Sequence, residues 1–296
     1  MVVTTSASEE RVDAKKNMID PHIHSSRFCI HQVTMMEQCS FQQFVECLAR
    51  HGIDKAAIWR PKLDQVGVSL GKKLLEDHGI DPVALCAAVL LGDVPTNQCH
   101  ERVECNRKII EQAAAIGAPS VIVITGGLAA YGRDIAGARA MCLEILGELG
   151  RHARDLGINL ILEPLHPMVC GNRSVISTLQ EANLMLNAID MDDVLGIALD
   201  TYALWWQSDL ESQIKEAGSR ISHFHVSDWL PDTKDVRLDR GMPGDGLIDN
   251  REIRHWLEAT GFNGPVEVEI FSKRDWWTRP EDEVVSVIRQ RYETCL

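Results

Sequence analysis

Apolar runs of residues alternate along the chain with longer segments in which apolar side chains recur every three or four positions. A short apolar run bounded by turn residues is typical of a buried strand, and the wider spacing is typical of an amphipathic helix. Each predicted strand is followed by a predicted helix, which makes eight strand–helix units in a row. The predicted strands cover residues 28–34, 55–60, 82–90, 119–125, 159–163, 194–200, 221–228 and 265–271.

Glycines close several of the predicted helices, as in "ARHGI", "AIGAP" and "DLGIN". Regular alternation of strands and helices implies parallel pairing, and eight units in roughly 250 residues suit a closed (β/α)₈ TIM barrel of the α/β class. A doubly wound open sheet also alternates, but no glycine-rich phosphate loop follows the first strand. We therefore predict one barrel domain over residues 28–296, preceded by a polar, loosely attached lead-in over residues 1–27.

The overall composition excludes several classes of partner. The formal charge of −13 argues against nucleic acid and anionic membranes, because both require a positive face. No apolar run approaches the ~20 residues that span a bilayer. The nine cysteines include no CxxC pair, which fits free thiols in a reducing compartment, and we expect a cytoplasmic protein.

Side chains that commonly bind metal ions stand at the ends of the last four predicted strands. The ends of the strands are where (β/α)₈ barrels carry their catalytic residues. A carboxylate at the end of a buried strand costs several kcal/mol unless a cation pairs with it. The candidates, in chain order, are Glu163, Asp200, His223, His225, Asp228, Glu267 and Glu269.

Alternation places Glu267 and Glu269 on one face of their strand, but it does not decide which face points into the barrel, since parallel strands are buried on both sides. We favour Glu269 because it lies nearer the strand end, and His225 over His223 for the same reason. His223 is equally explained as a core histidine with a satisfied partner.

Three carboxylates and one imidazole form an oxygen-rich donor set. Such a set favours one divalent metal ion, Mn²⁺ first, with Mg²⁺, Co²⁺ or Zn²⁺ as alternatives. The other interpretation is that each acid caps the following helix or ends at water. Four neighbouring strands with the same arrangement favour the metal.

Five motifs carry a resemblance to a known family: "LEPLHP", "LDTY", "HFHVSDW", "RGMPGDGLID" and "GFNGPVEVEIF". Together they resemble the xylose isomerase-like TIM-barrel superfamily, in its sugar phosphate isomerase/epimerase branch. The resemblance implies a metal held by Glu163, Asp200, His225 and Glu269. It also implies that Arg240 contacts substrate and that the mouth of the barrel is lined by His166, Trp59, Arg60, Trp205 and Trp206.

The family's chemistry implies a carbohydrate substrate, a ketose or keto-sugar. Glu163 and Glu269 would act as the acid/base pair, one removing the proton beside the carbonyl to give a metal-stabilised enediolate and the other returning a proton. One position departs from the epimerases, which commonly carry histidine where Ala203 stands here. Alanine cannot hydrogen-bond a substrate oxygen.

The nearest alternative is therefore a lyase on the same scaffold, resembling inosose dehydratases or deglycosidases of 3-keto-glycosides and C-glycosides. In that case the same proton abstraction is followed by loss of a leaving group, with His166 as the acid. An unsaturated product instead of an epimer would distinguish the two.

Three further alternatives are weaker. A phosphodiesterase resembling endonuclease IV would need more histidines and a basic face. An amidohydrolase is suggested by His22 and His24 in "DPHIH", but that motif precedes the first predicted strand. A barrel that binds without turnover is the third. Four tryptophans in loops suggest, if exposed, a covered mouth or a homo-oligomer face: Trp205, Trp206, Trp276 and Trp277. They are equally explained as apolar packing of the loops.

Overall fold

The computed structural model describes residues 27–92 and 95–296, and its central feature is a closed barrel of eight parallel strands. The predicted TIM-barrel fold is confirmed. Around the barrel the strands follow the order β1–β2–β3–β4–β5–β6–β7–β10, with β10 pairing back onto β1. Their bounds are β1 Phe28–His31, β2 Lys55–Trp59, β3 Asp81–Cys86, β4 Ser120–Val123, β5 Asn159–Leu162, β6 Leu195–Asp200, β7 Ile221–Val226 and β10 Val266–Val268.

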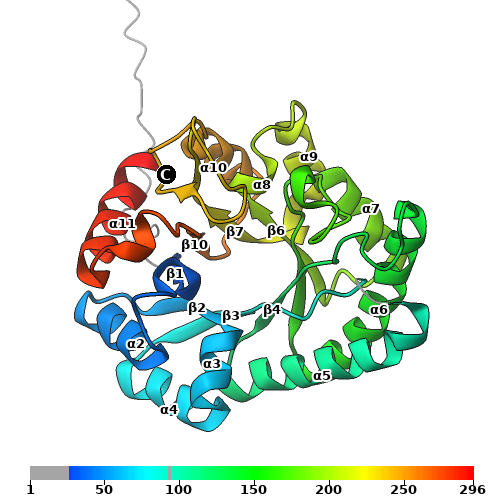
Figure 1. Ribbon diagram of the computed structural model, residues 1–296, viewed down its shortest axis with the longest axis horizontal. Helices are drawn as coiled ribbons and strands as arrows, with labels where there is room; N and C mark the ends of the chain where they lie inside the picture. Colours follow the sequence, from blue (N-terminus) through cyan, green and yellow to red (C-terminus); the bar gives the residue numbers. More distant parts are fainter. Residues whose placement is uncertain (1–26, 93–94) are drawn as a thin grey trace, which may run out of the picture.

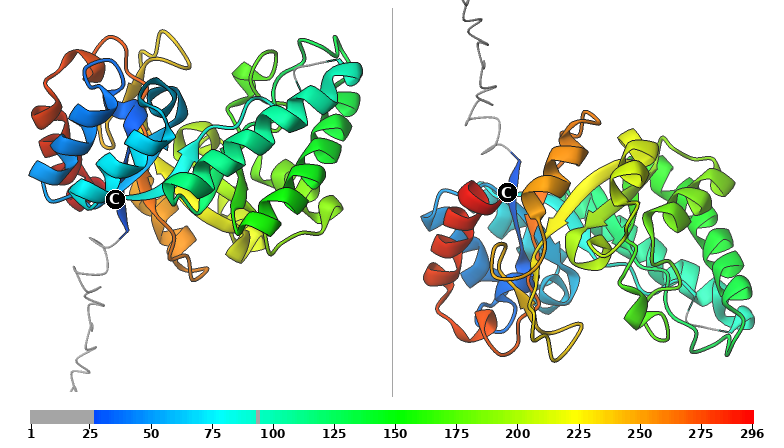
Figure 2. Two further views of the ribbon diagram at one scale, coloured as in Figure 1. Left: turned by 90° about the horizontal axis from the view of Figure 1, so that it is seen from below. Right: turned by 90° about the horizontal axis from the view of Figure 1, so that it is seen from above.

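Helices surround the barrel, and the chain runs once around it, so that α11 near the C-terminus packs beside α2 near the start of the barrel (Figure 1). Figure 2 shows the helices from two further sides. The α-helices are α2 Phe41–Arg50, α3 Arg60–Val66, α4 Val68–His78, α5 Cys99–Ile116, α6 Ile135–Leu156, α7 Leu179–Ile189, α8 Thr201–Leu204, α9 Leu210–Ala217, α10 Asn250–Glu258 and α11 Glu281–Cys295. Short 3₁₀ turns are η1 Gln32–Met35, η2 Thr96–Gln98, η3 Pro167–Val169, η4 Gly218–Arg220 and η5 Trp276–Thr278.

Local sequence signals explain where several helices start and stop. Ser40 and Gln43 form a reciprocal capping box that begins α2. Gly117 and Gly157 end α5 and α6 in the left-handed conformation, with φ of 82° and 67°, which glycine adopts without a steric cost. These are two of the glycine stops that the sequence predicts.

The barrel interior is built in two layers of inward-pointing side chains. Small or aliphatic residues fill the lower layer on six strands: Cys29, Ala57, Ala84, Ile122, Ile161 and Ala198. On β7 and β10 the same layer is polar, because Glu267 is in register with both Cys29 and His225 and contacts the ring of His223. Alternation did not decide which face of this strand points into the barrel. The inward-pointing face is thus the one that carries Glu267 and Glu269.

Several strands are shorter than predicted, because side chains take over the backbone hydrogen bonds at the top of the barrel. β1 ends at His31 and the chain turns into η1, whereas the pattern predicts a strand to residue 34. The Thr34 hydroxyl donates to the Val268 carbonyl and accepts from the Ile270 amide. That exchange ends β10 at Val268, so Glu269 lies just beyond the strand. β3 likewise ends at Cys86 instead of residue 90.

A two-stranded antiparallel hairpin, β8 Asp228–Trp229 and β9 Arg240–Gly241, extends the chain above β7. Asp228, one of the candidate ligands, organises this hairpin: its carboxylate accepts from the amides of Trp229, Gly244 and Ile248. Its oxygens are therefore committed to backbone donors and not to the interior cluster.

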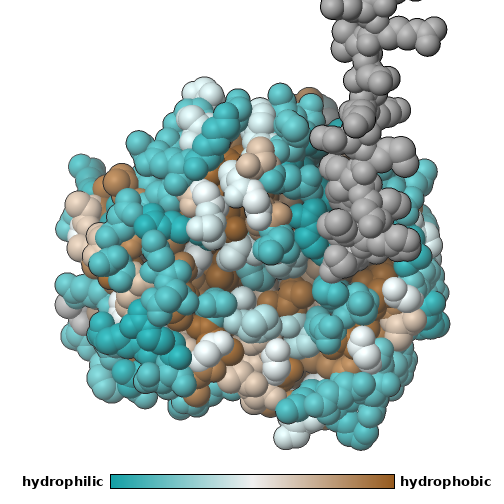
Figure 3. All heavy atoms as spheres, turned by 180° about the vertical axis from the view of Figure 1, so that it is seen from behind, coloured by the Kyte–Doolittle hydropathy of each residue, from teal (hydrophilic) through white to brown (hydrophobic). Residues whose placement is uncertain are grey.

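The outer surface mixes polar and apolar side chains. Seen from behind the view of Figure 1, hydrophilic residues project and hydrophobic residues lie mostly in the furrows between them (Figure 3). Across residues 27–92 and 95–296, no helix is both long and apolar enough to cross a membrane.

Candidate metal centre and substrate pocket

The four predicted ligands lie at the top of the barrel interior, one on each of four neighbouring strands. Glu163 directly follows β5, Asp200 ends β6, His225 is the penultimate residue of β7 and Glu269 follows β10. All four side chains are buried. Backbone hydrogen bonds from Glu163 to Val123 and from Glu269 to Val226 continue the sheet pairing and hold both carboxylates in place.

Three of the four side chains meet directly. The Nδ1 atom of His225 lies 2.9 Å from Oε1 of Glu163 and 3.8 Å from Oε2 of Glu269. One donor atom from each of these residues lies within 4.8 Å of the others. Ligand atoms that share one divalent ion at about 2.0–2.2 Å are separated by similar distances. The spacing therefore suits a shared cation.

Arg240 connects Asp200 to this cluster. Its Nη1 atom lies 3.1 Å from Oδ2 of Asp200 and 3.0 Å from Oε2 of Glu269. The guanidinium also lies over two aromatic rings, 4.5 Å from the centroid of Tyr202 and 5.1 Å from that of Phe271. Burial by itself would lower the pKa of Arg240, but Asp200 and Glu269 raise it, so the group is charged. Hairpin strand β9 thus delivers a fixed cation to the mouth.

The cluster holds more negative than positive charge. Asp200, Glu163 and Glu269 are three carboxylates, and Arg240 pairs with two of them. Burial raises the pKa of Asp200, and Arg240 opposes that effect. A divalent cation would offset the excess and replace the hydration that buried carboxylates lose. The donor set, three carboxylates and one imidazole, thus fits a hard or borderline divalent ion.

His31, at the end of β1, completes the upper layer on the side of the barrel opposite β5. Its Nδ1 accepts the Val33 amide, so Nε2 carries the proton, and Nε2 lies 3.5 Å from Oε1 of Glu269. This Nε2 has no hydrogen-bond partner among the described residues. Burial lowers the pKa of His31, which favours the neutral ring. His31 therefore presents an N–H toward Glu269 instead of a metal-binding lone pair.

Beneath the upper layer, Glu267 lies between two histidines. It contacts Nδ1 of His223 at hydrogen-bond distance, and its Oε1 lies 3.4 Å from Nε2 of His225. Burial alone would raise the pKa of Glu267, but the imidazoles of His225 and His223 lower it. For His225, burial would lower the pKa, but Glu267 and Glu163 raise it well above the ordinary value. His223 is thus a core histidine with a buried carboxylate partner, as one of the two sequence interpretations has it.

A pocket of about 80 Å³ opens above this cluster. Of the predicted substrate-binding residues, Trp59, His166 and Arg240 line it together with Glu163 and Glu269. His166 stacks on Trp229, with ring centroids 4.8 Å apart. The other lining residues are Cys86, Ala87, Ile122, Ile124, Leu165, Val169, Arg173, Tyr202, Ala203, Val236, Arg237 and Phe271.

Two predicted substrate residues lie away from this pocket. Arg60 begins α3, where its Nε donates to the Ala87 carbonyl and its Nη1 pairs with Asp64 at 2.8 Å. Trp205 follows α8 and packs against Trp229, with ring centroids 6.0 Å apart. Neither side chain is among those that line the pocket.

Sequence reasoning missed several residues of the pocket. A strand-end signal like the one for Asp200 was available for His31, the last residue of β1. Tyr202 lies two residues beyond Asp200, which ends β6. Arg173 and Arg237 stand in irregular loops, where no period indicates which way a side chain points.

For one pair of the tryptophans, the structure supports apolar packing instead of exposure. Trp276 and Trp277 are buried in the apolar packing around η5, and the indole of Trp277 donates to the Val33 carbonyl. Trp206 is exposed, at 40%. His22 and His24 lie outside the described residues. All nine cysteines are free thiols.

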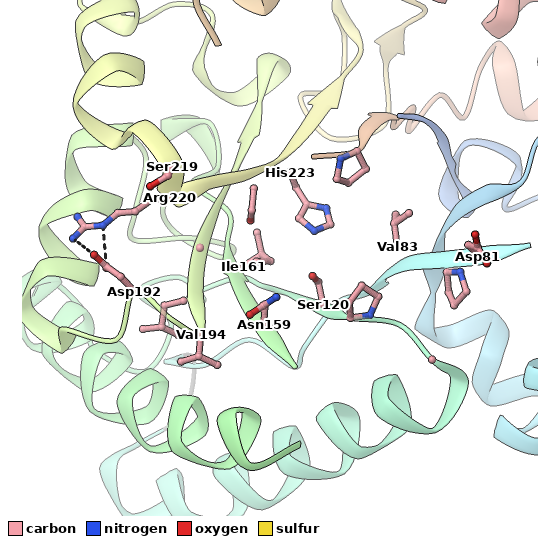
Figure 4. A pocket seen from close by; sticks show the side chains of 17 residues that line it. Asp81, Val83, Ser120, Asn159, Ile161, Asp192, Val194, Ser219, Arg220 and His223 are labelled. Atoms are coloured by element: carbon pink, nitrogen blue, oxygen red, sulfur yellow. Dashed lines mark hydrogen bonds and ion pairs between the residues drawn. The ribbon is translucent and has the colours of Figure 1, made fainter. Parts of the chain in front are cut away.

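A second, larger cavity of about 630 Å³ lies at the other end of the barrel, among the starts of β3 to β7. Figure 4 shows His223 pointing into it from β7, with Ser120 and Asn159 across the space. At its side, Arg220 and Asp192 form a two-pronged ion pair of 3.0 and 2.9 Å. Its lining mixes polar and apolar side chains, and Arg220 and Asp192 are paired with each other.

Comparison with known proteins gives a consistent family assignment. The sequence model of the family described as "xylose isomerase-like TIM barrel" matches residues 43–291. An inosose isomerase of Bacillus velezensis is 25% identical, over 91% of this chain and 97% of its own length.

Among solved structures, protein SMc04130 of Sinorhizobium meliloti is 36% identical, with a TM-score of 0.88, over 92% of this chain and 98% of its own. A structure of the IolI protein with a bound zinc atom has a TM-score of 0.77 at 21% identity, over 89% and 95% of the two chains. The second likeness shows the shared fold.

Proposed function

Since the chain belongs to the xylose isomerase-like TIM-barrel family, we propose that it is a divalent-metal-dependent isomerase or epimerase of a ketose or keto-sugar. The observation that carries the proposal is the upper interior layer, where Glu163, His225 and Glu269 converge beneath the pocket of about 80 Å³. The likeness to an inosose isomerase supports a keto-substrate, and the zinc in the IolI structure supports a divalent ion.

The proposed metal ligands are Glu163, Asp200, His225 and Glu269. When bound, the divalent ion supplies polarisation of the substrate carbonyl and of the neighbouring hydroxyl, which acidifies the C–H bond between them. Mn²⁺ is our first candidate for an oxygen-rich set, and Zn²⁺, Mg²⁺ and Co²⁺ are the others.

The protein's own residues then move one proton. Glu163 follows β5 and Glu269 follows β10, and both carboxylates face Nδ1 of His225. We assign one of them to take the proton from the substrate carbon and the other to return it to the opposite face. Arg240 provides a fixed positive charge beside the oxygens on which negative charge develops, and it is already oriented by Asp200 and Tyr202.

The aromatic walls exclude water and orient the ring or chain of the sugar. Trp59 and Phe271 pack edge to face, with centroids 6.0 Å apart, on one side of the pocket. Ala203 lines the pocket where many epimerases carry a histidine, so this chain must hold that substrate oxygen by other means or leave it solvated. Two other lining residues can hydrogen-bond a substrate oxygen: Tyr202, next to Ala203, through its hydroxyl, and His166 through its imidazole.

The test is proton exchange in D₂O, followed by NMR, with a panel of ketoses, inososes and 3-keto-glycosides. The protein is loaded with Mn²⁺ and then treated with a chelator. We expect metal-dependent deuterium uptake with formation of an isomer or epimer. Uptake accompanied by loss of water or of an aglycone would assign a lyase instead, and absence of exchange with every compound would contradict the proposal.

A further inference from the structure

Two arginines at the mouth of the pocket have no anionic partner within the part of the chain that the structure describes. Arg173 lies in the loop after η3, and Arg237 lies in the loop between β8 and β9. Both line the pocket that contains Glu163 and Glu269. Over residues 27–92 and 95–296, neither guanidinium forms an ion pair or a side-chain hydrogen bond, whereas Arg60 and Arg240 of the same region are each paired with a carboxylate.

The loops that carry these arginines are well tied down. The Arg173 amide donates to the Val169 carbonyl at 2.8 Å, and Ser174 pairs with Gly126 across the top of β4. On the other side, the carboxylate of Asp235 accepts the amides of Arg237 and Leu238. These bonds fix the backbone on both sides of the pocket that the two arginines line.

The two charges disfavour each other in the protein alone. Arg173 is partly buried. Desolvation makes the largest contribution to lowering the pKa of its guanidinium, and the nearby positive charge of Arg237 lowers it further. Glu163 and Glu269 act in the opposite direction. The Arg237 guanidinium lies over the face of Phe271, with its central carbon 6.0 Å from the ring centroid.

Metal binding would increase the uncompensated positive charge at Arg173 and Arg237. With a divalent ion present, the three carboxylates are offset by that ion and by Arg240, and Glu163 and Glu269 no longer compensate the loop arginines. Two positive charges then remain at the mouth of a chain whose formal charge is −13. Paired guanidinium groups are well suited to bind a carboxylate or a phosphate through two-pronged hydrogen bonds.

We propose that Arg173 and Arg237 form a subsite for an anionic group on the substrate, so that the substrate is a keto-sugar bearing a carboxylate or a phosphate away from its carbonyl. This rests on the proposed function for the location of the carbonyl. The subsite lies at the rim of the pocket, and the reacting carbons lie deeper, beside Glu163 and Glu269.

The experiment is calorimetric titration of the Mn²⁺-loaded protein with three ketoses that share one carbonyl end: D-fructose, D-fructuronate and D-fructose 6-phosphate. The readout is the ratio of the dissociation constant of D-fructose to that of each anion. We expect at least a tenfold preference for one anion. A preference for the uronate assigns a carboxylate, and a preference for the phosphate ester assigns a phosphate.

The variants are Arg173→Gln and Arg237→Gln, with Arg151→Gln as the matched control. Arg151 is exposed on outer helix α6 and loses the same charge. We expect the anion preference to fall below threefold in each loop variant and to persist in the control. A ratio near one in the wild type, an unchanged ratio in both loop variants, or no saturable binding of any of the three ketoses would overturn the proposal.

The same samples separate this proposal from the proposed function. An anion preference that depends on Arg173 and Arg237, without deuterium uptake, keeps the subsite and rejects the isomerase. Deuterium uptake into D-fructose with no anion preference does the reverse. Added NaCl should weaken binding of the anionic ketose more than binding of D-fructose, because the proposed contact is between charges.

Discussion

The two ends of the barrel interior both carry a cavity, and they differ in how their charges are satisfied. At the N-terminal end the cavity measures about 630 Å³, and its Arg220–Asp192 pair is complete in itself. At the C-terminal end the cavity is about 80 Å³. There, Arg240 pairs with Asp200 and Glu269, and the third buried carboxylate, Glu163, contacts His225. Volume reflects how strand ends and loops fill space. The capacity of a site for binding and catalysis depends instead on buried charge that the protein alone does not balance.

The same strands, with every second side chain pointing inward, form both ends of the barrel. The two interior layers connect these ends. The lower layer is mostly alanine, cysteine and isoleucine, with Glu267 and His223 as its polar part. The upper layer replaces small side chains by Glu163, Asp200, His225 and Glu269. Residues two positions apart on one strand thus belong to different layers: the lower layer packs the core, and the upper layer carries the candidate ligands. Substitutions in each layer test this contrast.

The largest effect is expected from the upper layer. Glu163→Gln and Glu269→Gln keep the shape of the side chain but remove a base, so the rate of deuterium exchange should fall by about 10²–10⁴-fold. NMR in D₂O measures the rate. Glu144→Gln, on the exposed face of α6, is the matched control and should exchange at the wild-type rate. Exchange that survives in both active-site variants would remove the acid/base assignment.

The second prediction concerns removal of the metal. Mn²⁺ at roughly 100 times its dissociation constant should stabilise the folded protein by about 2.7 kcal/mol, since it binds the native cluster and not the unfolded chain. In thermal unfolding this corresponds to a rise on the order of 5 °C, reversed by a chelator. A double variant, Asp200→Asn with Glu269→Gln, should show no such rise. An equal rise in that variant would place the ion elsewhere.

A smaller effect is expected from the layer below. Glu267 faces Nε2 of His225 and so favours the ring orientation in which Nδ1 points toward Glu163 and Glu269. Glu267→Gln should weaken Mn²⁺ binding by about 10–100-fold in calorimetry.

The control in the same layer is Cys29→Ala, because Cys29 is in register with Glu267 but carries no charge at neutral pH. Burial raises the pKa of its thiol well above the ordinary value. Nitrogen chemical shifts of His225 provide a second readout, which general destabilisation would not move. Unchanged affinity and unchanged shifts in Glu267→Gln would show that Glu267 is only part of the core.

The smallest effect is expected at the N-terminal end. Asp192→Asn breaks a half-exposed ion pair and should lower the free energy of unfolding by about 1 kcal/mol or less. The exchange rate and the affinity for Mn²⁺ should stay within twofold of the wild type. A loss of exchange in this variant would mean that the larger cavity takes part in the chemistry, and the comparison between the two ends would fail.

The fold was predictable because it rests on local signals repeated around the chain. Eight apolar runs, the helical periods between them and glycine stops such as Gly117 and Gly157 each act over a few residues. Their regular order leaves a closed parallel barrel as the simplest solution. Strand ends were less predictable, because Thr34 competes for the backbone of β10 from a distant part of the sequence.

The candidate ligands were predictable for a similar reason. Glu163 and Asp200 follow uninterrupted apolar runs, and the ends of consecutive parallel strands meet at one end of a barrel. Loop residues lacked such a rule. Arg60 was expected in the pocket and pairs with Asp64 instead, whereas Arg173 lines the pocket without any periodic signal.

By itself, the sequence determined the barrel, the order of its strands and the set of carboxylates and imidazoles at the strand ends, since these follow from period, turn chemistry and topology. Only the tertiary structure decided which face of β10 points inward, which cation bridges Asp200 to Glu269, and which arginines remain without a partner. Those outcomes depend on distances between residues far apart in the chain, such as Arg173 and Arg237, and local patterns contain no information about such distances.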